Sequence, residues 1–252
     1  MTTAMPPPAR EPLSARRVLV TGASAGIGES TARALTARGA RVALVARRGE
    51  RLAELAAELP GAVAVPADLT DDAAAAAAVH TAADALGGLD AVVNAAGVFH
   101  GGPVLGDEPS TPDQWRRMFG LNVVALLVVT RAAAEHLERG TEPAVVCVSS
   151  MSGRRVPNPA GAVYAASKHA VHAVAEGLRA ELAPRGVRVT TVSPGFARTG
   201  IVDGWPDGAL RDRYTERLAT VGLDPAVVAD GIVHVLASPA QVVEYALTSV
   251  TQ

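Results

Sequence analysis

The chain has 252 residues, of which 49% are hydrophobic and only 3% aromatic, so its core must consist mainly of Ala, Val and Leu. A formal net charge of -2 gives no general attraction to phosphate backbones or anionic membranes, and we therefore expect a small-molecule ligand and no nucleic acid or membrane partner. The single cysteine, Cys147, has no disulfide partner within the chain, and the histidines show no metal-ligand spacing, so no metal is predicted.

The N-terminal segment, residues 1–16, is rich in Pro and Ala and lacks the continuous apolar stretch of a secretory signal. We expect it to be a disordered tail. No uninterrupted apolar run approaches the roughly 20 residues that span a bilayer, so the sequence predicts a soluble, cytoplasmic protein.

From residue 17 onward, short β-branched runs alternate with longer Ala- and Arg-rich segments. Strands are predicted at residues 18–20, 41–45, 62–65, 91–93, 144–148, 188–192 and 243–248. Helices are predicted at residues 30–38, 51–59, 72–86, 113–139, 162–182 and 225–237. With no repeat or long linker, this alternation predicts one doubly wound, Rossmann-type α/β domain over residues 17–252, with a seven-stranded parallel sheet and helices on both faces.

The least regular stretch of this domain covers residues 200–222. Gly and Pro residues interrupt it, and Trp205 and Tyr214 lie among them. A loop of this length between core elements often closes over a binding site, so the stretch is predicted to form a lid.

A glycine-rich segment, Thr21-Gly22-Ala23-Ser24-Ala25-Gly26-Ile27-Gly28, directly follows the first predicted strand. Glycines let the backbone approach a pyrophosphate, and the helix that follows presents unpaired N–H groups. The spacing differs from the commonest dinucleotide fingerprint, and by itself such a segment is often only a tight turn. Its place after the first strand favours a phosphate cradle with cofactor-binding residues Gly22, Ser24, Ala25, Gly26, Ile27 and Gly28.

The end of the second predicted strand reads Ala46-Arg47-Arg48. In this fold a carboxylate at that point favours NAD, whereas a guanidinium favours the 2′-phosphate of NADP. Arg47 and Arg48 therefore favour NADP(H) over NAD(H), the alternative being two solvated arginines at the start of a helix. Asp68 and Leu69 follow the third strand at a suitable distance to contact the adenine, although Asp68 could equally begin a helix.

Tyr164 and Lys168 lie four residues apart in a predicted helix, so their side chains share one face. An unperturbed tyrosine is a poor acid-base catalyst at neutral pH, and a neighbouring ammonium lowers its pKa by stabilising the phenolate. The pattern alone is weak and arises by chance in many proteins. Upstream, the strand at 144–148 ends in Ser149-Ser150-Met151-Ser152-Gly153, where a hydroxyl can reach a ligand, although a serine in a turn is usually only a turn residue.

These motifs, in this order, resemble the single-domain branch of the short-chain dehydrogenase/reductase family over the chain from residue 17 onward. The segment from Thr21 to Gly28 is similar to its Thr-Gly-x-x-x-Gly-x-Gly loop. A second cofactor-binding motif, similar to its Asn-Asn-Ala-Gly, comprises Asn94, Ala95, Ala96 and Gly97, with Ala95 in place of the second asparagine.

The resemblance also implies site residues. Asn122 matches the position that holds a proton-relay water, and the register of Gly153 selects Ser150 as the catalytic serine. Together with Tyr164 and Lys168 these form the implied catalytic set. Tyr164 and Lys168 are also implied to contact the cofactor, as are four residues that border the nicotinamide, namely Pro194, Gly195, Phe196 and Thr199.

The function that follows is an NADP(H)-dependent oxidoreductase that interconverts a carbonyl and an alcohol on a small molecule, with Tyr164 as general acid/base. Because cells usually keep NADP reduced, we expect the reductive direction. The alternatives are an NAD(H)-dependent alcohol dehydrogenase, a non-catalytic dinucleotide-sensing protein, and a nucleotide-sugar dehydratase or epimerase, which generally needs a longer C-terminal region than the one after Thr199.

The substrate stays open at this stage. Arg154 and Arg155 follow the serine turn and could bind a substrate carboxylate, although arginine there is more often surface charge. Five apolar residues could line a pocket or belong to the core, namely Val98, Phe99, Met151, Phe196 and Trp205. The resemblance also implies a homodimer or homotetramer formed through the helices at 113–139 and 162–182.

Overall fold

Seven parallel strands form one sheet in the computed structural model, which describes residues 13–105 and 109–251. The strand order is β3-β2-β1-β4-β5-β6-β7, and every pairing is parallel. The strands are β1 (Arg17–Thr21), β2 (Arg41–Ala46), β3 (Val63–Pro66), β4 (Ala91–Asn94), β5 (Ala144–Val148), β6 (Arg188–Pro194) and β7 (Glu244–Leu247). The predicted doubly wound fold is confirmed, because the order reverses beside β1.

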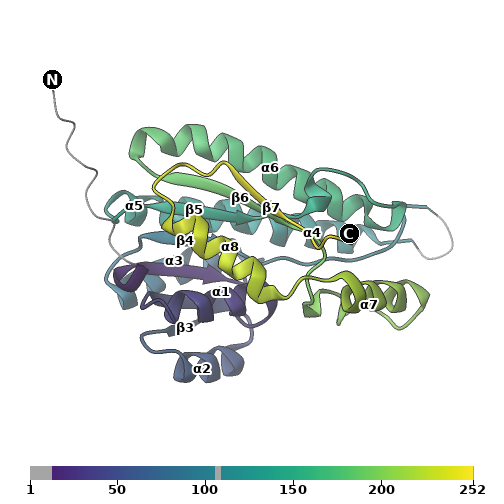
Figure 1. Ribbon diagram of the computed structural model, residues 1–252, viewed down its shortest axis with the longest axis horizontal. Coiled ribbons are helices and arrows are strands. Elements are labelled where there is room, and N and C mark those ends of the chain that lie inside the picture. Colours follow the sequence, from purple (N-terminus) through teal and green to yellow (C-terminus); the bar gives the residue numbers. More distant parts are fainter. Residues whose placement is uncertain (1–12, 106–108, 252) are drawn as a thin grey trace.

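Helices cover both faces of this sheet (Figure 1). They are α1 (Gly26–Thr36), α2 (Gly49–Glu58), α3 (Asp72–Leu86), α4 (Pro112–Phe119), α5 (Ala125–Glu138), α6 (Ala162–Leu182), α7 (Ala209–Val221) and α8 (Pro225–Ala237). Successive strand residues point to opposite faces, so Val18 and Val20 of β1 lie in a core with α1, α2 and α8, whereas Leu19 lies in a core with α3, α5 and α6. Strands that are buried on both faces explain the continuous apolar runs in the sequence.

In the structure, the predicted helix at 113–139 is divided into three consecutive elements: α4, a π-helical turn and α5. A capping box between Thr111 and Gln114 starts α4, and a single π-helical turn, Gly120–Val124, separates α4 from α5. One extra residue per turn shifts the side chains of this segment relative to a regular helix, and such turns occur frequently at functional sites. Asn122 lies within it.

By length and composition alone, the helical stretch Pro112–Glu138 could cross a membrane. It packs against α3 and α6, and several of its apolar residues belong to the core on that side of the sheet. Phe119, Val124 and Leu127 on the same stretch are exposed. Whether they contact a second copy in a homodimer or homotetramer stays a prediction.

The start of the folded domain differs from the prediction. Residues 1–12 lie outside the described residues, but the last four residues of the predicted tail do not: Leu13–Ala15 form a 3-10 turn and Arg16 is buried. Arg16 donates hydrogen bonds to the carbonyls of Leu236 (2.8 Å) and Glu142 (2.6 Å), so it belongs to the folded domain.

The predicted lid at 200–222 is not a continuous loop. It contains the 3-10 turn Gly200–Val202 and the helix α7, and Figure 1 shows α7 beyond the carboxyl ends of the strands. The Gly and Pro residues that suggested a loop lie before α7 and not within it.

Candidate active site

The glycine-rich segment joins β1 to α1 at the carboxyl edge of the sheet. Gly22 and Gly26 have φ of 67° and 55°, which other residues rarely adopt. Gly28, predicted as loop, lies in the first turn of α1, where a Cβ atom would come within 2.3 Å of the Gly22 carbonyl oxygen. Ala25 precedes the helix without a side-chain cap, so the first N–H groups of α1 remain open to an anion.

The two arginines after β2 lie next to this segment. Arg48 donates to the Ser24 carbonyl oxygen (2.9 Å) and contacts the Ser24 hydroxyl through Nε (3.2 Å) and Nη2 (3.0 Å). Arg47 is exposed, and its charge helps to lower the pKa of Asp68, although the main cause is the hydrogen bond from the Thr70 backbone. The side-chain cap of α3 is Asp71 and not Asp68, so the structure does not favour Asp68 as a helix start.

The motif at residues 94–97 begins with the last residue of β4 and packs against the glycine-rich segment. The Thr21 hydroxyl accepts hydrogen bonds from the backbone N–H groups of Ala95 (3.0 Å) and Ala96 (3.1 Å), and Asn94 donates to the Thr130 hydroxyl (3.1 Å). These contacts fix the loop without the asparagine that Ala95 replaces.

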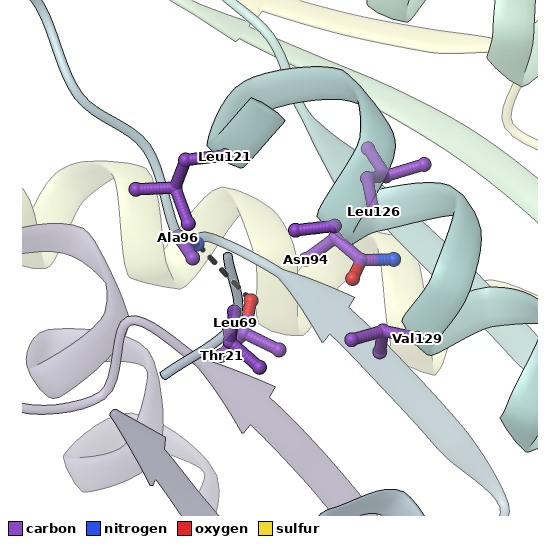
Figure 2. A pocket seen from close by; sticks show the side chains of 8 residues that line it. Thr21, Leu69, Asn94, Ala96, Leu121, Leu126 and Val129 are labelled. Atoms are coloured by element: carbon purple, nitrogen blue, oxygen red, sulfur yellow. Dashed lines mark hydrogen bonds between the residues drawn. The ribbon is translucent and has the colours of Figure 1, made fainter. Parts of the chain in front are cut away.

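A small cavity of about 10 Å³ lies beside this motif, and Figure 2 shows the side chains that line it. The buried Asn94 Oδ1 has no hydrogen-bond partner in the part of the chain that the structure describes. The lining residues, one of which is the predicted adenine contact Leu69, are Thr21, Leu69, Asn94, Ala96, Leu121, Ala125, Leu126 and Val129.

Asn122 connects the loop after β4 to α6. Its amide accepts from the Val98 N–H (2.8 Å) and donates to the Val98 carbonyl (3.0 Å) and the Ser167 hydroxyl (3.0 Å). A Cβ atom placed on Gly97 would lie 3.3 Å from Asn122 Oδ1 and 3.6 Å from Lys168 Nζ. The two side chains therefore converge on the same point, and their membership of one catalytic set stays a prediction.

Ser150 is the serine that lies beside Tyr164. Burial raises the pKa of Tyr164 to about 12, and a hydrogen bond with the Ser150 side chain opposes this rise. Ser149 is engaged elsewhere, since its hydroxyl donates to the Lys168 carbonyl (3.0 Å). The Ser150 hydroxyl also accepts from the Ser152 N–H (3.1 Å), which starts the 3-10 turn Met151–Gly153.

Lys168 is buried on the same helix, with its Nζ 5.8 Å from the centroid of the Tyr164 ring. It donates to the Val148 carbonyl (3.0 Å), and burial lowers its pKa to about 8. The expectation that Lys168 lowers the pKa of Tyr164 is not met in this structure. Burial of the phenol has the larger effect, and the ammonium is turned toward a backbone carbonyl.

An aromatic cluster covers Tyr164. The Phe99 ring lies 4.5 Å from the Tyr164 ring, 4.8 Å from Trp205 and 5.3 Å from Tyr214 between centroids. The Trp205 indole N–H donates to the Phe99 carbonyl (2.5 Å), and the Tyr214 hydroxyl accepts from Asn158 (3.2 Å). Residues from the predicted lid thus pack directly on the residues around Tyr164.

The segment after β6 lies between this cluster and the glycine-rich segment. Pro194 ends β6, and the Gly195 N–H donates to the Leu247 carbonyl (2.8 Å). A Cβ atom on Gly26 would lie 2.9 Å from the Thr199 methyl group, which places Thr199 against the predicted phosphate cradle. Phe196 stacks under Arg217 at 5.2 Å.

The two arginines of the serine turn differ. Arg154 forms an ion pair with Glu244 of β7 (2.5 Å), so it is not free for a substrate carboxylate, whereas Arg155 is exposed. Among the described residues, no three His, Cys, Asp or Glu side chains gather in a way that could hold a metal ion.

Sequence reasoning missed several residues that build the site. Thr21 and Ser167 each act through a hydroxyl, and each lies within a segment already identified, Ser167 three residues after Tyr164. Tyr214 and Asn158 close the cluster from segments 56 residues apart, and no sequence spacing indicates such a contact.

Comparisons with known proteins identify relatives of this chain. Residues 16–209 match the family described as short chain dehydrogenase. An uncharacterised oxidoreductase of Staphylococcus epidermidis is 33% identical over 225 residues, covering 89% of this chain and 92% of that protein. A meso-2,3-butanediol dehydrogenase of Serratia marcescens is 34% identical over 204 residues, covering 80% of this chain and 79% of that enzyme.

Solved structures are similar over nearly the full length. A short chain dehydrogenase from Burkholderia cenocepacia, in complex with NADP, has a TM-score of 0.82 at 35% identity and covers 94% of this chain and 98% of its own. A 3-ketoacyl-(acyl-carrier-protein) reductase from Brucella melitensis, complexed with NADH, has a TM-score of 0.80 at 29% identity and covers 93% and 97%. The chain belongs to the short-chain dehydrogenase/reductase family and is an oxidoreductase that acts on CH-OH or carbonyl groups with a nicotinamide dinucleotide cofactor.

Proposed function

We propose that this chain reduces the carbonyl group of a small molecule with NADPH, and that Tyr164 donates the proton. The observation that carries the proposal is the Tyr164 phenol beside the Ser150 hydroxyl, one helical turn from the buried Lys168. A proton donor, a hydroxyl that can hold an oxygen, and a cation meet there at the carboxyl edge of a parallel sheet, where ligands bind in such folds.

The protonation state of Tyr164 supports the reductive direction. A pKa of about 12 keeps the phenol protonated at neutral pH, so it is ready to give a proton to an oxygen that gains negative charge. Oxidation of an alcohol would instead begin from the phenolate, which burial disfavours here.

The other three residues act around this proton transfer. The Ser150 hydroxyl lies beside the phenol and is proposed to donate to the same substrate oxygen. The Lys168 charge would stabilise the phenolate that remains, and Asn122, which converges with Lys168 near Gly97, is proposed to hold the water that returns a proton to Tyr164.

The loops at this edge fit a dinucleotide. The uncapped start of α1 and the glycines that allow close backbone approach suit a pyrophosphate, and Arg47 and Arg48 suit a 2′-phosphate. The residues that would hold it, besides Tyr164 and Lys168, are Gly22, Ser24, Ala25, Gly26, Ile27, Gly28, Arg47, Arg48, Asp68, Leu69, Asn94, Ala95, Ala96, Gly97, Pro194, Gly195, Phe196 and Thr199. When bound, NADPH supplies the hydride.

The aromatic cluster indicates the kind of substrate. Phe99 packs against the Tyr164 ring, and Trp205 and Tyr214 pack against Phe99, so the substrate would approach against apolar surface. We expect small aldehydes or ketones with uncharged, apolar substituents to be reduced fastest.

The test is loss of NADPH absorbance with a panel of such carbonyl compounds, for the wild type and Tyr164→Phe. We expect Tyr164→Phe to lose at least about 100-fold in kcat, the lower end of general acid catalysis, with the Kd for NADPH changed less than about twofold. The control is Tyr245→Phe, which also removes one phenol hydroxyl. Tyr245 packs against the core on the α8 side of the sheet, so this variant should retain activity. Full activity in Tyr164→Phe would overturn the mechanism.

A further inference from the structure

A network of polar side chains lies behind the turn that carries Ser150. The Glu244 carboxylate of β7 accepts from Arg154 Nε (2.9 Å) and from the Ser193 hydroxyl of β6 (2.7 Å). The Ser193 hydroxyl also contacts Nε2 of His172 on α6 (3.3 Å). Three residues from separate parts of the chain, Arg154, His172 and Ser193, therefore gather around Glu244, and none of the four belongs to the catalytic or cofactor sets.

This network touches the Ser150 turn at both ends. At one end, His172 forms a hydrogen bond with the Ser150 backbone, and a Cβ atom on Gly153 would lie 2.6 Å from His172 Cδ2. At the other end, Arg154 directly follows the turn Met151–Gly153 and is held by Glu244. These contacts hold the turn against α6 and lead back to one carboxylate, beside the direct contact between Ser149 and the Lys168 carbonyl.

Glu244 is suited to this position because it stays charged. Burial raises the pKa of Glu244, but hydrogen bonds from Arg154 and Ser193 outweigh that effect and hold the pKa below its usual value. Both carboxylate oxygens are used, Oε2 by Arg154 Nη2 and Oε1 by Arg154 Nε and Ser193. A fork-to-fork pair of this kind fixes direction as well as distance.

We propose that Glu244 is a positioning residue: through Arg154 on one side, and Ser193 and His172 on the other, it fixes the turn that aims the Ser150 hydroxyl at the substrate oxygen. The inference rests on the proposed function, since it gives Ser150 a role in carbonyl reduction. It adds that the last strand of the sheet sets the geometry of that serine, although β7 contributes no group to the reaction itself.

The test is Glu244→Gln, which keeps the size of the side chain and removes its charge and one acceptor oxygen. We expect kcat to fall about tenfold, because small misplacements of a reacting group lower rates strongly, with the Kd for NADPH changed less than about twofold. The matched control is Glu138→Gln, the same change in a Glu138–Arg185 ion pair at the end of α5, which should leave kcat unchanged.

A double-mutant cycle with Ser150→Ala separates positioning from general stability. If Glu244 acts through Ser150, then Glu244→Gln lowers kcat about tenfold in the wild type but less than about twofold in Ser150→Ala, measured by product formation over long incubations. Equal losses in both backgrounds, or an unchanged kcat in Glu244→Gln, would overturn the inference. Full activity in Ser150→Ala would instead overturn the proposed role of Ser150.

Ser193→Ala and Arg154→Ala test the inference independently, in case Glu244→Gln does not fold. Each removes one contact of Glu244, and thermal melting shows whether each variant is folded. Each should lower kcat in the wild type and not in Ser150→Ala, with a smaller effect for Ser193→Ala because Arg154 still holds the carboxylate. Arg154→Lys keeps the charge and should recover part of the activity lost in Arg154→Ala.

Discussion

Cofactor preference should depend on Arg47 and Arg48 in different ways. Arg47 is exposed and free of the glycine-rich segment, whereas Arg48 holds that segment through three contacts with Ser24. A hydrogen bond to a charged group contributes about 1.5–3 kcal/mol, and solvent exposure favours the lower half of that range. Loss of about 1.5–2 kcal/mol corresponds to a Kd for NADPH about 10–30-fold higher in Arg47→Ala.

Fluorescence titration with NADPH and NADH measures this effect. NADH lacks the 2′-phosphate and serves as the control ligand, so its Kd should change less than about twofold in Arg47→Ala. Arg48→Ala should weaken both cofactors, because the Ser24 contacts that hold the glycine-rich segment are also lost. Equal weakening of NADPH and NADH in Arg47→Ala, or a wild type that binds NADH more tightly, would refute the reasoning.

Two further predictions concern pH and stability. Burial lowers the pKa of Lys168 to about 8, so its charge is present below pH 8 and lost above it. We therefore expect kcat for reduction to fall as the pH rises through about 8. A kcat that stays constant up to pH 10 would contradict a need for the ammonium. The buried Asp90 carboxylate accepts from Arg17 and from the Thr141 N–H, so Asp90→Asn should cost about 3 kcal/mol and lower the Tm by about 6–12 °C, measured by circular dichroism. An unchanged Tm would contradict this estimate.

The fold could be predicted because its signals are local. Each strand is a short apolar run, whereas the helices are longer segments rich in Ala and Arg. The alternation of these two kinds of segment alone indicates a parallel sheet with two covered faces. The Tyr164 and Lys168 pair was equally accessible, since four residues in a helix place both on one face. Ser150 required the resemblance to a family, because the turn offers three serines and only the tertiary contact with Tyr164 distinguishes them.

The helix α7 and the π-helical turn could not be predicted in this way. α7 is largely polar, with Tyr214 and Leu218 as its buried residues, so its sequence carries little apolar periodicity. The π-helical turn leaves the apolar composition of the surrounding helix unchanged, and it is defined only by the backbone. Both features surround the site, where local patterns are weakest.

The pKa of Tyr164 is the clearest case in which the spacing of residues in the sequence predicts the wrong direction. A lysine four residues away predicts a lowered pKa, and the structure gives a raised one. The difference comes from burial: Phe99, far away in the sequence, packs its ring against the Tyr164 ring, and Trp205 packs against Phe99. A lysine that points to the Val148 carbonyl cannot offset that burial. The same tertiary contacts therefore keep Tyr164 protonated, which suits the proton donor that we propose.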